Sequence, residues 1–156
     1  MKLFLSMFLS LPILIGAQTE ATAQGFSALL EKIEISVKDS EPNWKLETKE
    51  EYQANYILYN WKSAAKEVTV EITSTASAQE AVNMLKNTAM RVPVAPKHVT
   101  QSIGDEAVLY KSDSSDSSML LYTKSNIFVK VTGSDFHDTD RFAKLIADQI
   151  PSKSSK

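Results

Sequence analysis

The sequence predicts an α+β fold: an antiparallel sheet with two helices on one face, preceded by an N-terminal helix. Two stretches of the 156-residue chain carry this prediction. Residues 119–150 contain, in order, an alternating apolar strand, a short polar turn, a second strand, a loop and an amphipathic helix. Residues 57–89 repeat this order of elements with different residues. Apolar strand faces and helix stripes of this kind pack economically in two layers, with both of these helices across one face of the sheet.

The first 23 residues have the pattern of a cleaved signal peptide. Lys2 supplies a positive charge, residues 3–15 are an almost unbroken apolar run, and residues 21–23 have the small side chains that signal peptidase needs. As a helix the apolar run rises only about 20 Å, too short for a hydrocarbon core of about 30 Å. We therefore expect a cleaved leader at 1–23, a single α+β domain at 24–150, a disordered tail at 151–156, and a periplasmic or secreted protein.

The composition narrows the chemistry that the chain can perform. It contains no cysteine, which excludes disulfides, thiolate catalysis, cysteine metal sites and lipid attachment at a cysteine. The formal net charge is −2 with acids and bases interspersed, so nucleic acid is not expected as a partner. Two histidines and four glycines leave little material for a histidine-based triad or a phosphate-binding loop. We expect no cofactor, and the lack of these motifs favours a non-enzymatic protein over an enzyme.

The first half of the chain predicts a helix, three strands and a second helix. Apolar residues at spacings of three and four indicate a helix over 24–37, although alternation in its last residues also fits a strand. Residues 44–52 form a charged strand typical of a sheet edge, and 55–72 form a hairpin with one buried face. Ser77 and Glu80 have the spacing of a capping box, in which each side chain bonds a backbone amide at the helix start.

The second half predicts strands at 99–103, 107–111, 119–124 and 127–132, and then a helix. Ser125-Asn126 provides a tight turn, because asparagine tolerates a left-handed backbone. We expect Asp138 or Thr139 to cap the last helix and Pro151 to stop it.

The two halves match when the first is shifted by 61 residues, which places Val70 on Val131 and aligns the expected helix starts. The preceding strand matches better with a shift of 63, which places Tyr59 on Tyr122 and makes the first turn two residues longer. A duplicated βββα unit and coincidental periodicity are equally open at this point.

Asp135, His137, Asp138 and Asp140 form the densest cluster of potential ligands. Carboxylate and imidazole donors this close suit a divalent cation, and a hydrolase or metal-dependent enzyme is the alternative function that they would support. Acids at a helix start also cap amides and complement the helix dipole. We prefer this second explanation and predict no metal, because no second helix supplies a return ligand.

The sheet face turned away from the two helices is the preferred binding surface. Tyr56 and Leu58 alternate with the apolar core positions of their strand, Phe128 does the same in its own strand, and one of Leu121 and Tyr122 joins them. Such a mixed face suits an unknown protein partner or a small ligand in the cell envelope, with Tyr56, Leu58, Tyr122 and Phe128 as contact residues. The alternative is that the helix at 24–37 covers this face, because its apolar stripe must be buried.

We therefore expect a soluble, exported, non-enzymatic binding or accessory module that uses a sheet face or an edge strand. An inhibitor of an exported enzyme, acting through the loop at 113–118, is a further alternative. Gly104-Asp105-Glu106-Ala107, the hairpin around Ser125-Asn126 and Ala143-Lys144-Leu145-Ile146 together resemble the ends of small secreted bacterial proteins of uncharacterised domain families. This resemblance covers about a third of the chain and implies no catalytic residues.

Overall fold

The computed structural model describes residues 16–97 and 103–152, with side chains from residue 25 onward. The elements are α1 (Gly16–Ser40), β1 (Lys45–Tyr52), β2 (Tyr56–Ser63), β3 (Lys66–Ser74), α2 (Ala78–Ala89), β4 (Glu106–Lys111), β5 (Ser118–Lys124), β6 (Ile127–Gly133) and α3 (Phe136–Gln149). Most of the predicted leader (1–15), most of the strand expected at 99–103, and the end of the predicted tail (153–156) lie outside the described residues.

The six strands form one antiparallel sheet in the order β1-β2-β3-β6-β5-β4. The predicted α+β class and antiparallel sheet are confirmed. β1 is an edge strand, as its charges indicated, and its register shifts between Leu46 and Thr48. Charges and an irregularity of this kind protect an edge from pairing with other chains. Among the described residues, no helix is both long and apolar enough to cross a membrane.

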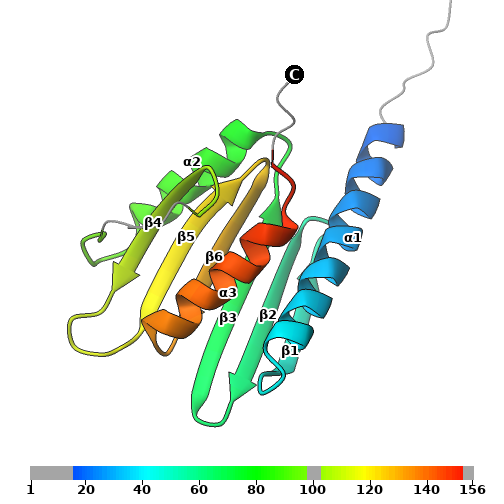
Figure 1. The fold of residues 1–156 in the computed structure, drawn as a ribbon. Coiled ribbons are helices and arrows are strands. Elements are labelled where there is room, and N and C mark those ends of the chain that lie inside the picture. The colour runs from blue at the N-terminus through cyan, green and yellow to red at the C-terminus, as the bar shows by residue number, and fades with distance from the viewer. Residues whose placement is uncertain (1–15, 98–102, 153–156) are drawn as a thin grey trace, which may run out of the picture.

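Helices cover both faces of the sheet (Figure 1). α1 and α3 lie on one face, which we call the inner face, and bury a core that includes Ile33, Val70, Val131 and Phe142. α2 lies on the opposite, outer face, where it forms a smaller core with β4, β5 and β6. Two helices do share one face, but they are α1 and α3; the expectation that α2 lies beside α3 is wrong.

The strands themselves explain this arrangement. β5 and β6 are apolar on both faces: Leu121 and Phe128 face outward, whereas Tyr122 and Val129 face inward. Apolar surface on both sides of a strand pair requires cover on both sides. α2 supplies this cover with Ala81, Leu85 and the half-buried residues around them.

α1 is a helix throughout, and the strand alternative for its last residues is wrong. All of its predicted stripe is buried: Phe26, Leu29, Leu30, Ile33 and Val37. Ile35, which alternation would have placed with Ile33 and Val37, is 52% exposed.

The capping box of α2 is present in modified form. The Ser77 Oγ accepts a hydrogen bond from the Glu80 amide at 3.2 Å. The Glu80 side chain accepts from the amide of Ala76 at 2.9 Å, one residue before the expected donor, Ser77.

The two hairpins formed by β2–β3 and by β5–β6 are equivalent in register. β3 and β6 pair at the centre of the sheet, with Val70 opposite Val131. Both hairpin turns have two residues, Ala64-Ala65 and Ser125-Asn126, so a shift of 61 relates both strands of each hairpin. The expectation of a longer first turn is therefore wrong.

The helices do not share this equivalence. If the two halves of the sheet were related by a two-fold axis perpendicular to the sheet, the helices that follow them would lie on the same face. α2 and α3 instead lie on opposite faces, and their caps, Ser77 and Asp135, are offset by three residues from the shift that relates the strands. The internal similarity is thus a property of the four central strands and does not extend to a βββα unit.

The β2–β3 turn and the β5–β6 turn each place a non-glycine residue in the left-handed region. The φ angles are 53° at Ala64 and 59° at Ser125, whereas the sequence pointed to Asn126. Because glycine adopts positive φ without a steric penalty, we expect Ala64→Gly and Ser125→Gly each to raise the free energy of unfolding by about 0.5–1 kcal/mol in urea titrations. Ala65→Gly is the control, since Ala65 is not in this conformation and should lose stability. Equal effects at positions 64 and 65 would contradict the turn geometry.

Candidate functional site

Among the described residues, α2 covers one half of the outer face of the sheet and leaves the other half uncovered. α2 packs over β5 and β6, where Leu121 and Phe128 are buried. β1, β2 and β3 extend beyond this helix (Figure 1), and Tyr56 and Leu58 on β2 are half-buried there. We call the uncovered half, made by the outward residues of β1, β2 and β3 with Lys130 and Thr132 of β6, the open face.

The open face contains two of the four predicted contact residues. Phe128 is only 5% exposed because α2 covers it. Tyr122 faces inward and is fully buried, and its hydroxyl donates to the carbonyl oxygen of Ala143 in α3 at 3.1 Å. The expectation that these two residues face solvent is wrong, and Leu121 takes the outward position beside Phe128. The alternative that the N-terminal helix covers this face is also wrong, since α1 packs on the inner face.

Strand register arranges the open face in rows across the strands. Leu58 lies opposite Glu50 on one side and Glu71 on the other, and Glu71 lies opposite Lys130. The neighbouring rows consist of Tyr52, Tyr56 and Thr73, and of Thr48, Asn60, Thr69 and Thr132. The rings of Tyr52 and Tyr56 are 5.7 Å apart, and Tyr52 is 53% exposed. A single aliphatic side chain thus sits among tyrosines, hydroxyls and charges.

Ordered polar contacts surround Leu58. The Tyr56 hydroxyl donates to Oε2 of Glu71 at 3.1 Å, and Lys130 Nζ lies 2.7 Å from the Oε1 of the same carboxylate. Partial burial, followed by the negative charge of Glu71, raises the pKa of Tyr56 to about 12. Tyr56 is therefore a neutral donor across the physiological range, held in place before any ligand arrives.

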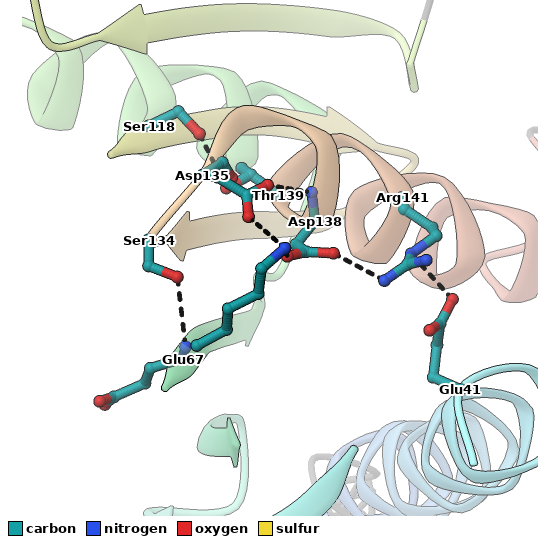
Figure 2. Close-up of polar contacts among 9 residues, drawn as sticks. Glu41, Glu67, Ser118, Ser134, Asp135, Asp138, Thr139 and Arg141 are labelled. Atoms are coloured by element: carbon teal, nitrogen blue, oxygen red, sulfur yellow. Dashed lines mark hydrogen bonds and ion pairs between the residues drawn. The ribbon is translucent and has the colours of Figure 1, made fainter. Parts of the chain in front are cut away.

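The acidic cluster at 135–140 is built into the start of α3 (Figure 2). Asp135 is the N-cap, and its Oδ1 accepts from the Asp138 amide at 2.8 Å. The expected caps, Asp138 and Thr139, lie inside the helix and are buried. Thr139 instead accepts a hydrogen bond from the Ser118 hydroxyl at 2.8 Å and donates to the Asp135 carbonyl. The predicted cap position is thus wrong by three to four residues.

Two cations, Lys66 of β3 and Arg141 of α3 itself, neutralise these carboxylates. Lys66 Nζ lies 2.7 Å from Asp135 Oδ2 and 2.7 Å from Asp138 Oδ2. Arg141 Nη2 lies 2.6 Å from Asp138 Oδ1, and its Nε lies 2.9 Å from Glu41 Oε1 (Figure 2). We call Glu41, Lys66, Asp135, Asp138 and Arg141 the α3 ion-pair network. It ties the start of α3 to the β2–β3 hairpin and to the end of α1.

This network gives the predicted ligands a structural role. Within the described residues, no three His, Asp or Glu side chains are grouped so that they would hold a metal ion. Asp140 pairs with Lys144 at 2.6 Å, and His137 is exposed on the first turn of α3. Asp138 itself is 2% exposed and already has two cationic partners. Asp135, Asp138 and Asp140 therefore each have a cationic partner already.

Asp135 gives the α3 ion-pair network a dependence on pH. Partial burial acts to raise the pKa of Asp135, but hydrogen bonds from the Lys66 ammonium and the Asp138 amide outweigh it and hold that pKa below its ordinary value. A depressed carboxyl pKa contributes stability above the unfolded value, near 4, that is lost as pH falls toward the folded value. We expect acid unfolding of Asp135→Asn to show a weaker loss of stability between about pH 5 and pH 2, smaller by about 1–2 kcal/mol. An unchanged pH profile would contradict this role.

Sequence alternation found Tyr56 and Leu58 and missed Asn60 and Tyr52. The alternation of side chains along a strand could have identified both residues. Asn60 follows Leu58 by two positions in β2, and Tyr52 ends the edge strand β1. Comparison of the chain with protein-family models, with curated proteins and with solved structures gave no match. The open face and the contacts around it are therefore the basis for a functional conclusion.

Proposed function

We propose that this protein is a non-enzymatic binding module that holds a protein partner on its open face. The observation that carries the proposal is Leu58, a half-buried aliphatic residue in the middle of an uncovered sheet surface. Protein interfaces commonly combine an apolar or aromatic centre with a rim of polar groups. Leu58 with Tyr52 and Tyr56 supplies the centre, and Glu71, Lys130 and the threonines supply the rim.

The shape of the open face supports an extended partner over a small molecule. Small ligands bind in concave sites that enclose most of their surface. Tyr56 borders a groove beside α1, but Leu58 and Glu71, near the middle of the open face, do not line that groove. An ion pair and a hydrogen bond already fix Lys130, Glu71 and Tyr56 beside Leu58, so binding there requires little ordering of these side chains. In this proposal the leader predicted at 1–23 directs the module to the periplasm or the outside of the cell.

Site-specific photo-cross-linking tests the proposal. A benzophenone amino acid at position 58 should cross-link one protein in living cells. The same group at Asp148, exposed on α3 of the opposite layer, should not. With that partner purified, Leu58→Glu should weaken binding at least tenfold, because it places a charge where the partner packs an apolar group. Equal cross-linking at positions 58 and 148, or an unchanged affinity of a folded Leu58→Glu variant, would rule the open face out.

A further inference from the structure

A groove of about 430 Å³ lies between α1 and the end of the β1–β2 hairpin. Its walls include Phe26, Leu30, Glu31 and Glu34 of α1, and Lys49 and Glu51 of β1. Tyr56 of the open face borders this groove, but Leu58, Glu71 and Lys130 do not line it. This groove is a second surface that adjoins the open face at Tyr56, and its charge and lining are independent of the proposed function.

The groove exists because the inner face of the edge strand is polar. Lys49 and Glu51 lie opposite Tyr59 and Ile57 of β2, which are buried beneath the helices. α1 packs closely over β2, where the Tyr59 hydroxyl lies 3.5 Å from the Leu30 carbonyl oxygen. Charged residues are costly to bury, so the space between α1 and β1 stays open to solvent.

Negative charge dominates the groove. Glu34 is hydrogen-bonded to Lys38 at 2.7 Å, and this bond, opposed by partial burial and aided by Lys49, lowers the pKa of Glu34. The carboxylate is therefore ionised at neutral pH. Glu31 and Glu51 add two more carboxylates to the groove. Lys49 is the one cationic residue among those that line it. A positively charged ligand complements this surface.

Lys49 marks the position that such a ligand's charge would take. Its Nζ lies 3.3 Å from Glu34 Oε2 on one wall and 3.5 Å from Glu51 Oε1 on the other. It also lies 5.9 Å from the centre of the Tyr59 ring. Both ion pairs are longer than the 2.7 Å contact between Glu34 and Lys38, and the Lys49 side chain is 39% exposed. A cation in this position is held loosely enough to be exchanged.

The groove also offers apolar contact for an aliphatic stem. Phe26 and Leu30 line it from α1, and Ile35 beside them is 52% exposed. Long cationic side chains bury their methylene groups against apolar surface while the charged head stays at polar groups. Arginine fits better than lysine, because its planar guanidinium can bond two carboxylates at once.

We propose that this groove binds an arginine side chain of a basic, apolar peptide segment in a partner polypeptide. The stem lies on Phe26 and Leu30, and the guanidinium lies between Glu34 and Glu51. Lys49 moves out toward solvent as the arginine enters. The groove thus recognises one arginine with an apolar neighbour. Lys49 lowers the affinity for this arginine, because it competes for the same carboxylates.

Titration of the ¹⁵N-labelled protein with acetyl-Gly-Leu-Arg-Leu-Gly-amide tests this site. Amide shifts should be confined to about residues 26–35 and 49–54. The matched peptide with citrulline, which has nearly the shape of arginine but no charge, should bind at least tenfold more weakly. Glu34→Gln should weaken arginine-peptide binding about tenfold, and Lys49→Gln should strengthen it about threefold, because the internal competitor is gone.

Two further variants serve as controls. Glu106→Gln on β4, at the other edge of the sheet, makes the same change in net charge as Glu34→Gln and should leave the affinity unchanged. Leu58→Glu should leave it unchanged as well, which separates this groove from the open face. Equal affinity for the citrulline peptide, shifts centred elsewhere, or weaker binding by both Glu34→Gln and Lys49→Gln would overturn the proposal.

Discussion

Replacing Phe142 with alanine is expected to lower the free energy of unfolding by about 3–5 kcal/mol, the largest loss that we predict for a single substitution. Phe142 is fully buried in α3, with its ring 5.0 Å from that of Trp44 and 6.2 Å from that of Trp61. These rings come from α3, from the segment after α1 and from β2. Truncation would leave a cavity where three parts of the inner-face core meet.

Urea unfolding followed by far-UV circular dichroism measures this loss, and tryptophan fluorescence reports on the same ring cluster. Phe136→Ala is the matched control, because Phe136 lies on the same helix and is 37% exposed. It should cost less than about 1 kcal/mol. Similar losses for the two variants would contradict the central position of Phe142.

Asp138→Asn is expected to lower the free energy of unfolding by about 2–3 kcal/mol. The Asp138 side chain is 3% exposed and accepts charge-assisted bonds from Lys66 and Arg141. An amide at this position keeps the shape but loses the charge that both cations need. Lys66 and Arg141 are partly exposed and can return to water, which limits the penalty.

A double-mutant cycle checks the origin of this loss. Lys66→Met and Asp138→Asn together should cost less than the sum of the two single changes, because either one removes the same contact. Asp140→Asn is the control, since its pair with Lys144 is more exposed and should contribute less than about 1 kcal/mol. Additive losses at positions 66 and 138 would show that the two side chains act independently.

The proposed binding surface was partly predictable from the sequence. Alternation along β2 placed Tyr56 and Leu58 opposite to Ile57, and the sheet confirms this placement. The same reasoning placed Phe128 correctly on the outer face but could not show that α2 covers it. The groove beside α1 was not predicted, because it depends on how closely α1 packs against the edge strand that follows it, which neither segment's own pattern specifies.

The sequence by itself determined the local elements. Apolar spacing of three and four defined α1, alternation defined the two hairpins, and the Ser77–Glu80 spacing marked the start of α2. Each of these signals comes from residues within a few positions of one another, so backbone geometry alone connects the pattern to the structure.

The tertiary structure decided which face each helix covers and what the acidic cluster does. α2 lies on the outer face because β5 and β6 need cover on both sides, a requirement that no single segment carries. Asp135 rather than Asp138 caps α3, because Lys66 and Arg141 hold the Asp138 carboxylate inside the helix start. The cover on both sides of β5 and β6 and the contact of Lys66 with Asp138 join residues distant in sequence, and they form only once the layers are assembled.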